Sequence, residues 1–192
     1  MRGNRQVPSH ELRLFFGLPL PERHRQALDS YIAECTAIAP SFRWTPAANL
    51  HLTVRFLGHV DPALAEGIAD RVAAARPLGF EVRLGGAGSF GRGRLARVVW
   101  LGLADGEEAI GELARLVEAE SVAGGLDAES RRFHAHLTLA RARPREGAPL
   151  PPMPGPPDLP GWRAGELVLY RSRLGRAGSV YEPLRTISLN PG

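Results

Sequence analysis

The sequence contains no lysine, a single cysteine and no long apolar run, and each absence excludes a class of protein. Cys35 has no partner for an internal disulfide, so a disulfide-stapled secreted fold is excluded. No apolar segment approaches the roughly 18 residues that a membrane-spanning helix needs. The first ten residues, MRGNRQVPSH, lack the apolar core of a signal peptide, so we expect a cytoplasmic protein with no membrane partner.

Because lysine is absent, all 24 residues counted as lysine or arginine are arginine. The 24 basic and 20 acidic residues give a formal net charge of +4, which suits polyanionic partners such as RNA. A codon bias towards arginine explains the same excess, so the placement of the arginines is more informative than their number. Residues 131–145 hold five arginines and no acidic residue, and the planar guanidinium group matches phosphate oxygens.

Length and composition predict one folded domain. A chain of 192 residues, 44% of them hydrophobic, can bury a core, and we expect a domain over residues 11–190 behind a loose tail, residues 1–10. Apolar periodicity indicates an α+β (α/β-like) fold whose strand pairing is undecided. The predicted strands are 12–18, 50–57, 79–84, 96–103, 133–140, 165–173 and 180–189, and the predicted helices are 22–38, 61–75 and 106–122. Residues 144–160 hold eight of the 17 prolines and are expected to form an extended, unpacked loop.

Two patterns lack the context that their chemistry requires. Residues 86–91, GAGSFG, match G-x-G-x-x-G, but no helix and no acidic partner follow, so we interpret them as a flexible hairpin connection. His134 and His136 could share one face of a strand and bind a metal, but no third ligand is evident, so no metal and no cofactor are predicted. Cys35 falls on the apolar stripe of helix 22–38, which indicates a core residue. The histidines without a supporting pattern are interpreted as surface residues: His10, His24 and His59.

One short motif occurs twice, 85 residues apart. The two copies are His51-Leu52-Thr53-Val54 and His136-Leu137-Thr138-Leu139. Side chains alternate between the faces of a strand, so each histidine shares a face with its threonine, about 7 Å further along, while the apolar residues face the core. Two amphipathic strands that happen to carry histidine would show the same pattern.

If two similar lobes bring these strands together, both histidines and both threonines face one site. A histidine has an ordinary pKa of about 6.5, so one ring can accept a proton from an attacking water while the other donates one to a leaving oxygen. The threonine hydroxyls can donate hydrogen bonds to the non-bridging oxygens between them. These groups suit a phosphodiester and need no metal ion. Arg141 follows the second motif closely and is the best candidate to bind the reacting phosphate.

The paired H-x-T-x motifs resemble those of the 2H phosphoesterase superfamily. The segments RWTPAANLHLTVRFLGHV (43–60) and FHAHLTLARAR (133–143) are similar to motif regions of bacterial and archaeal RNA 2′,3′-cyclic phosphodiesterases, historically called 2′-5′ RNA ligases. LRLFFGLPLPE near the start and YRSRLGRAGSVYEPL (170–184) near the end fit the same family, so the resemblance covers about residues 11–190. Ala135 stands where the family often has proline, and Phe90-Gly91 stands where it often has Phe-Pro.

The resemblance implies a bilobal fold with two pseudo-symmetric lobes, whose sheets face a central cleft and whose helices lie outside. It implies hydrolysis of RNA 2′,3′-cyclic phosphate ends to 2′-phosphate ends, with His51 as proton donor to the 3′ oxygen and His136 as the base that activates water. Thr53, Thr138 and Arg141 would bind the phosphate. Some relatives also join tRNA halves through a 2′-5′ bond, so ligation is an expected reverse reaction.

The implied partner is an RNA with a 2′,3′-cyclic phosphate end, such as a tRNA fragment, and we expect a monomer. The aromatic candidates for stacking on a base or ribose are Phe16, Phe56, Phe90 and Tyr170, and a core role is the alternative for each. Two other functions stay open. One is a phosphodiesterase for a small cyclic nucleotide or a 2′-5′ oligonucleotide, and the other is a non-catalytic module that binds RNA ends.

Overall fold

The computed structural model describes residues 11–175 and 178–191, and the expected tail, residues 1–10, lies outside this range together with His10. The elements in chain order are β1 (Leu12–Pro19), α1 (Glu22–Ile38), β2 (Phe42–Trp44), the 3-10 helix η1 (Ala47–Asn49), β3 (His51–Val60), α2 (Pro62–Ala74), β4 (Phe80–Arg92), β5 (Leu95–Asp105), α3 (Glu107–Ala123), β6 (Leu137–Ala142), β7 (Ala148–Pro149), β8 (Trp162–Ala164), β9 (Glu166–Gly175) and β10 (Gly178–Ser188). All three predicted helices are present. Asp61 caps α2, because its carboxylate accepts a hydrogen bond of 2.7 Å from the Ala63 backbone N–H.

The strands form one open sheet with two similar halves. Eight of them follow the order β10-β9-β1-β3-β6-β5-β4-β8, while β2 pairs with β6 and β7 pairs with β5. The pairings between these strands are antiparallel, which confirms the α+β class. We call β10-β9-β1-β3 the first half and β6-β5-β4-β8 the second half. The halves meet where β3 and β6 are matched at a single residue pair, Leu52 and Leu137.

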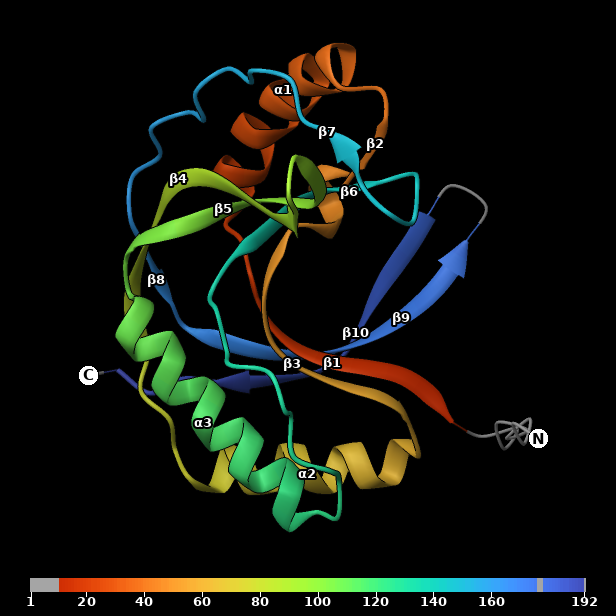
Figure 1. Ribbon diagram of the computed structural model, residues 1–192. Helices are drawn as coiled ribbons and strands as arrows, with labels where there is room; N and C mark the ends of the chain where they lie inside the picture. The colour runs from red at the N-terminus through yellow and green to blue at the C-terminus, as the bar shows by residue number, and fades with distance from the viewer. Residues whose placement is uncertain (1–10, 176–177, 192) are drawn as a thin grey trace, which may run out of the picture.

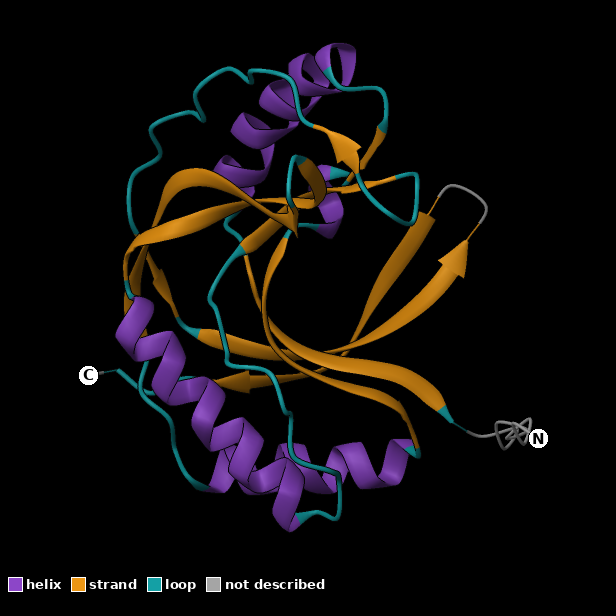
Figure 2. Ribbon diagram, viewed as in Figure 1, coloured by secondary structure: helices purple, strands orange, loops and turns teal. Residues whose placement is uncertain are grey.

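The helices cover the outer sides of the two curved halves, as Figures 1 and 2 show. Helices α2 and α3 pack on each other and against β3, while α1 contacts β2 and η1. The apolar side chains beneath these helices form the core, to which β1 contributes Leu14, Phe16 and Leu18. Of the helices in the described part of the chain, none is long and apolar enough to cross a membrane.

The glycine-rich stretch 86–91 is part of a strand, so its interpretation as a hairpin connection was wrong. It lies within β4, which runs on to Arg92, and the turn to β5 follows at Gly93, whose φ is +60°. Close contacts explain the glycines: a Cβ at Gly88 would collide with the indole of Trp100, and a Cβ at Gly91 would collide with the Leu95 backbone. The glycines therefore let β4 and β5 approach each other, and positive φ angles within the stretch are not the reason.

The second motif begins its strand later than predicted. Strand 133–140 was expected, but β6 starts at Leu137, so His136 lies immediately before it. Residues 133–136 are not part of a strand, and β3 and β6 are paired only at Leu52 and Leu137. The short strands β2, β7 and β8 were not predicted, since two or three residues carry too little periodicity to be recognised.

The proline-rich segment packs against α1, in contrast to the unpacked loop that was expected. Residues 150–161 have no regular secondary structure, but Leu150, Met153 and Leu159 pack against the core. The Tyr31 hydroxyl donates a hydrogen bond of 3.1 Å to the Pro154 carbonyl. His24 is fully buried beneath the segment and its Nε2 lies 2.8 Å from the Pro160 carbonyl, so its interpretation as a surface residue was wrong.

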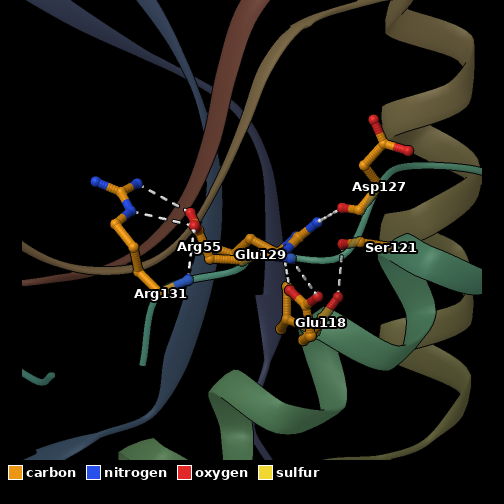
Figure 3. A network of polar contacts seen from close by, with 7 residues as sticks. Arg55, Glu118, Ser121, Asp127, Glu129 and Arg131 are labelled. Atoms are coloured by element: carbon orange, nitrogen blue, oxygen red, sulfur yellow. Dashed lines mark hydrogen bonds and ion pairs between the residues drawn. The ribbon is translucent and has the colours of Figure 1, made fainter. Parts of the chain in front are cut away.

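A network of polar contacts connects β3 to the segment that leads into the second motif (Figure 3). Arg55 of β3 is 8% exposed and forms an ion pair with Glu118 of α3. Its guanidinium also donates a hydrogen bond of 2.9 Å to the Asp127 carbonyl. The same Glu118 carboxylate accepts a hydrogen bond of 2.9 Å from the Glu129 backbone N–H. Glu118 therefore holds together a strand of the first half, α3 and the chain that precedes His136.

We expect Glu118→Gln to lower the free energy of unfolding by about 2 kcal/mol. Breaking a buried pair costs roughly 3–5 kcal/mol, and the partial exposure of Glu118 reduces that cost. Glu112→Gln is the matched control on α3, because Glu112 and its partner Arg115 are 67% and 75% exposed and such pairs contribute about 0–1 kcal/mol. Urea unfolding of both variants measures the difference, and equal losses would contradict a structural role for the Arg55 network.

Candidate active site

The junction between the two halves places both H-x-T motifs side by side. Leu52 and Leu137 are matched across antiparallel strands and are completely buried, so they fix the register with their side chains in the core. The flanking residues point to the opposite side of the sheet, and this register sets His51 beside Thr138 and Thr53 beside His136. We call this side the histidine face.

Both imidazoles are held in the same way. Nδ1 of His51 lies 2.8 Å from the Asn49 carbonyl, and Nδ1 of His136 lies 2.7 Å from the His134 carbonyl. A carbonyl oxygen only accepts hydrogen bonds, so Nδ1 carries the proton in each ring and Nε2 is free for proton transfer. Nε2 of His51 lies 3.0 Å from the Thr53 hydroxyl. In each motif the carbonyl two residues before the histidine therefore sets the tautomer.

The protein keeps both histidines uncharged at neutral pH when no ligand is present. Burial lowers the pKa of His51 to about 4, although the hydrogen bond to Asn49 opposes the change and the charges of Arg141 and His136 add to it. Burial also lowers the pKa of His136, although the hydrogen bond to the His134 carbonyl opposes the change and the charges of His134 and Arg141 add to it. Arg141 affects the pKa of both rings and His136 affects that of His51, so these three groups lie close to one another.

Arg141 joins the site from β6. It is matched with Arg43 of β2 on one side and with Val98 of β5 on the other. Desolvation lowers the pKa of its guanidinium, and the positive charges of Arg13 and Arg43 lower it further, against an opposing effect of Tyr181. Positive charge thus converges on the histidine face, where it can bind an anion.

Aromatic side chains surround His51 on the first half. Phe15 lies 4.7 Å from the imidazole, stacks on Tyr170 at 5.2 Å and contacts Phe56 at 5.4 Å, measured between ring centroids. Tyr181 meets His51 edge-on at 5.0 Å. Phe56 is 43% exposed, so it offers a free ring surface. Two of the predicted aromatic candidates, Phe56 and Tyr170, therefore lie at the site.

Phe16 does not lie at the site, and Phe15 was missed. Phe16 is fully buried in the core together with Leu14 and Leu18, because all three share one face of β1. Phe15 shares the other face with Arg13 and Gly17. The alternation of apolar residues at positions 14, 16 and 18 is a signal that could have distinguished the two phenylalanines in the sequence.

His136 has a different set of neighbours on the second half. Phe90, a predicted candidate, is 37% exposed and meets the His136 ring edge-on at 5.1 Å. Trp100 lies 6.3 Å from His136 and 5.1 Å from His134. The rings of His134 and His136 are stacked with centroids 5.9 Å apart, so they share a face as the sequence suggested. Trp100 was missed because only the tertiary fold places β5 beside the second motif.

Among residues 11–175 and 178–191, no group of three or more His, Cys, Asp or Glu side chains is arranged to hold a metal ion.

Comparison with known proteins decides the family. Residues 18–100 match the family model described as LigT like Phosphoesterase. The RNA 2′,3′-cyclic phosphodiesterase of Escherichia coli (strain K12) is 32% identical over 182 residues, which cover 94% of this chain and 98% of the relative. The chain belongs to the RNA 2′,3′-cyclic phosphodiesterase family. The RNA 2′,3′-cyclic phosphodiesterase of Aeropyrum pernix is 34% identical over 143 residues, which cover 71% of this chain and 80% of the relative.

Solved structures from the same family have the same fold. A phosphoesterase crystal structure matches with a TM-score of 0.81 and 29% identity, over 94% of this chain and 99% of the other. Escherichia coli LigT complexed with 3′-AMP matches with a TM-score of 0.78 and 29% identity, over 93% and 98% of the two chains. The family and the fold that the motifs predicted are therefore confirmed.

For this member of the RNA 2′,3′-cyclic phosphodiesterase family, we expect His51 to titrate near pH 4 in the absence of ligand. An NMR titration measures this, with the His51 resonance assigned from its loss in His51→Gln. Inorganic phosphate should move the midpoint upward, because a bound anion stabilises the imidazolium. A midpoint of about 6.5 or higher without phosphate would show that the ring is not desolvated.

Proposed function

We propose that this protein hydrolyses RNA 2′,3′-cyclic phosphate ends to 2′-phosphate ends. The observation that carries the proposal is the matched pair of imidazoles, each with Nδ1 bonded to the carbonyl two residues earlier and with Nε2 left without a proton. Relatives of the chain are RNA 2′,3′-cyclic phosphodiesterases, and solved LigT structures contain 3′-AMP or phosphate. Both facts support a nucleotide phosphate as the ligand of the histidine face.

In the proposed reaction, water attacks phosphorus in line with the 3′ oxygen, and Nε2 of His136 accepts a proton from the water. The bond from phosphorus to the 3′ oxygen breaks as Nε2 of His51 donates its proton to that oxygen. The phosphate stays on the 2′ oxygen. His136 ends with an extra proton and His51 has lost one, so exchange with solvent restores both rings.

The remaining polar groups stabilise the charge that develops on the phosphate. Thr53 and Thr138 are placed to donate hydrogen bonds to its non-bridging oxygens. Arg141 supplies a positive charge that already acts on both histidines, which places it close to a phosphate held between them. Phe56 and Tyr170 on the first half, and Phe90 on the second, are proposed to contact the nucleoside or to exclude water.

The proposed roles require that the substrate change the protonation of His51. Without ligand its pKa is about 4, so the ring is neutral at pH 7 and cannot act as an acid. A phosphodiester brings a negative charge next to the ring, and this charge raises the pKa of His51. Substrate binding is therefore coupled to the uptake of a proton, and affinity for phosphate should increase as the pH falls towards 6.

One chain contains the complete site, because each half supplies one motif. We therefore propose that residues 11–190 act as a single functional domain and as a monomer. The single thiol, Cys35, is buried and free, which supports a reducing compartment such as the cytoplasm. We propose RNA ends such as those of tRNA fragments as substrates.

We expect His51→Ala and His136→Ala each to lower kcat by roughly 100-fold or more, the usual effect of losing a general acid or base. The assay uses a short RNA with a 2′,3′-cyclic phosphate end, in EDTA, and identifies the product by mass and by the position of its phosphate. For the unaltered protein, we expect a product that has gained one water and carries a 2′-phosphate. Absence of hydrolysis by the folded protein would contradict the proposed function.

A sulfur-substituted substrate distinguishes the acid from the base. When sulfur replaces the bridging 3′ oxygen, the thiolate leaves without a proton, since a thiol is far more acidic than an alcohol. His51→Ala should then recover at least about tenfold of its lost rate, while His136→Ala should recover none. Recovery by His136→Ala alone would reverse the two roles.

Gly17 of β1 is a positioning residue for His51. A Cβ at Gly17 would lie 3.2 Å from Cδ2 of the imidazole and 3.1 Å from the Leu52 carbonyl, so Gly17→Ala must displace the ring. We expect kcat to fall about tenfold with little change in KM, because small displacements of a reacting group are costly. Gly165→Ala is the control, since the added methyl group would meet no atom within 4 Å. An unchanged kcat together with an unchanged pH profile would contradict this role.

A further inference from the structure

The direction of the RNA chain follows from the proposed roles of the two histidines, so this inference rests on the proposed function. In-line displacement puts the attacking water and the 3′ oxygen on opposite sides of phosphorus. If His51 protonates the 3′ oxygen, the ribose lies on the His51 side and the water lies on the His136 side. The rest of the RNA, which continues from the same ribose, must then cross the first half of the sheet.

The histidine face of the first half continues beyond the aromatic rings to a polar area. Arg13, Phe15 and Gly17 alternate with core residues along β1, so Arg13 lies on the same face as Phe15, about 7 Å further from the junction. Arg13 is exposed, and its guanidinium lies 3.5 Å from the hydroxyl of Ser172, which is 8% exposed on the neighbouring strand β9. A cation and a hydroxyl donor thus stand next to the accessible rings of Phe56 and Tyr170, which pack on the completely buried Phe15.

Arg13 is also close to the proposed binding site of the reacting phosphate. Its positive charge contributes, after desolvation, to the lowered pKa of Arg141. Because charges that face solvent are largely screened beyond roughly 10 Å, this influence agrees with the placement of Arg13 on β1 and Arg141 on β6 around the same site. No acidic side chain pairs with Arg13 among the ion pairs of the described residues.

We propose that Arg13, assisted by Ser172, binds the phosphate that lies one nucleotide upstream of the cyclic end. The terminal nucleoside then contacts the accessible rings of Phe56 and Tyr170, between Arg13 and Arg141. A guanidinium group supplies several donors to phosphate oxygens, and a single-stranded RNA combines such contacts with stacking on aromatic rings. The protein therefore recognises an RNA chain rather than a single cyclic nucleotide, by at least one phosphate beyond the reacting one.

The test compares two substrates that differ only in the upstream phosphate: a dinucleotide with a 2′,3′-cyclic phosphate end and the corresponding nucleoside 2′,3′-cyclic phosphate. Arg13→Gln should lower kcat/KM for the dinucleotide about tenfold and leave that for the mononucleotide unchanged within about twofold. The dependence of log(kcat/KM) on log salt for the dinucleotide should become shallower by about 0.7, as expected for the loss of one phosphate contact.

Arg173→Gln is the matched control, because Arg173 is an exposed arginine of β9 that pairs with Glu182 at 2.9 Å. It should affect neither substrate. Equal losses for the two substrates in Arg13→Gln, or no loss for either, would overturn the proposal. Calorimetric affinity for the dinucleotide product with a 2′-phosphate is measured in parallel and needs no turnover. If neither substrate is hydrolysed, the proposed function fails, while an unchanged product affinity in Arg13→Gln rejects the upstream site independently.

Discussion

The buried pair Leu52 and Leu137 is the constraint on which the site depends. It is the one matched residue pair between β3 and β6 in the described chain, and both side chains are completely buried. Because side chains alternate along a strand, burying these two leucines forces the histidine and threonine on either side of each to the opposite face. A shift of one residue in either strand would bury a histidine and expose a leucine, so hydrophobic burial selects the register that puts both histidines on one face.

Positive charge is concentrated at the same junction. Keeping the two imidazoles neutral limits the electrostatic repulsion there. Burial lowers the pKa of both imidazoles, and Arg141 lowers each of them further, so both rings are neutral at neutral pH. The ion pair of Arg55 and Glu118 lies on the opposite side of β3, among core residues and α3. There it holds the chain before His136 without adding charge to the histidine face. The arginine of the structural network and the arginine proposed to bind the phosphate thus lie on different faces of the sheet.

The sequence was sufficient for the parts of the site that local rules determine. A period of two put His51 and Thr53 on one face, the repeat pointed to His136, and the structure places Arg141 where its charge acts on both rings. The same rule separates Phe15 from Phe16, although the apolar run around them conceals it. Trp100 and the burial of His24 depend on contacts between distant segments, which no local pattern encodes. The prediction of a hairpin connection at residues 86–91 was wrong because glycine permits close packing of strands as readily as it permits a turn.

Each half contributes four strands of the main order and one motif, but the surroundings of the two histidines differ. His51 has the Thr53 hydroxyl at Nε2 and the rings of Phe15 and Tyr181 around it, so it is closely enclosed. His136 has a second imidazole beside it and precedes its strand, where no ladder holds the backbone. An enclosed ring suits an acid that must be charged only when a phosphate is present, since desolvation keeps its pKa low otherwise. The less enclosed ring suits a base that must receive a water molecule. The unlike surroundings of the two rings therefore support the proposed assignment of His51 as the acid and His136 as the base.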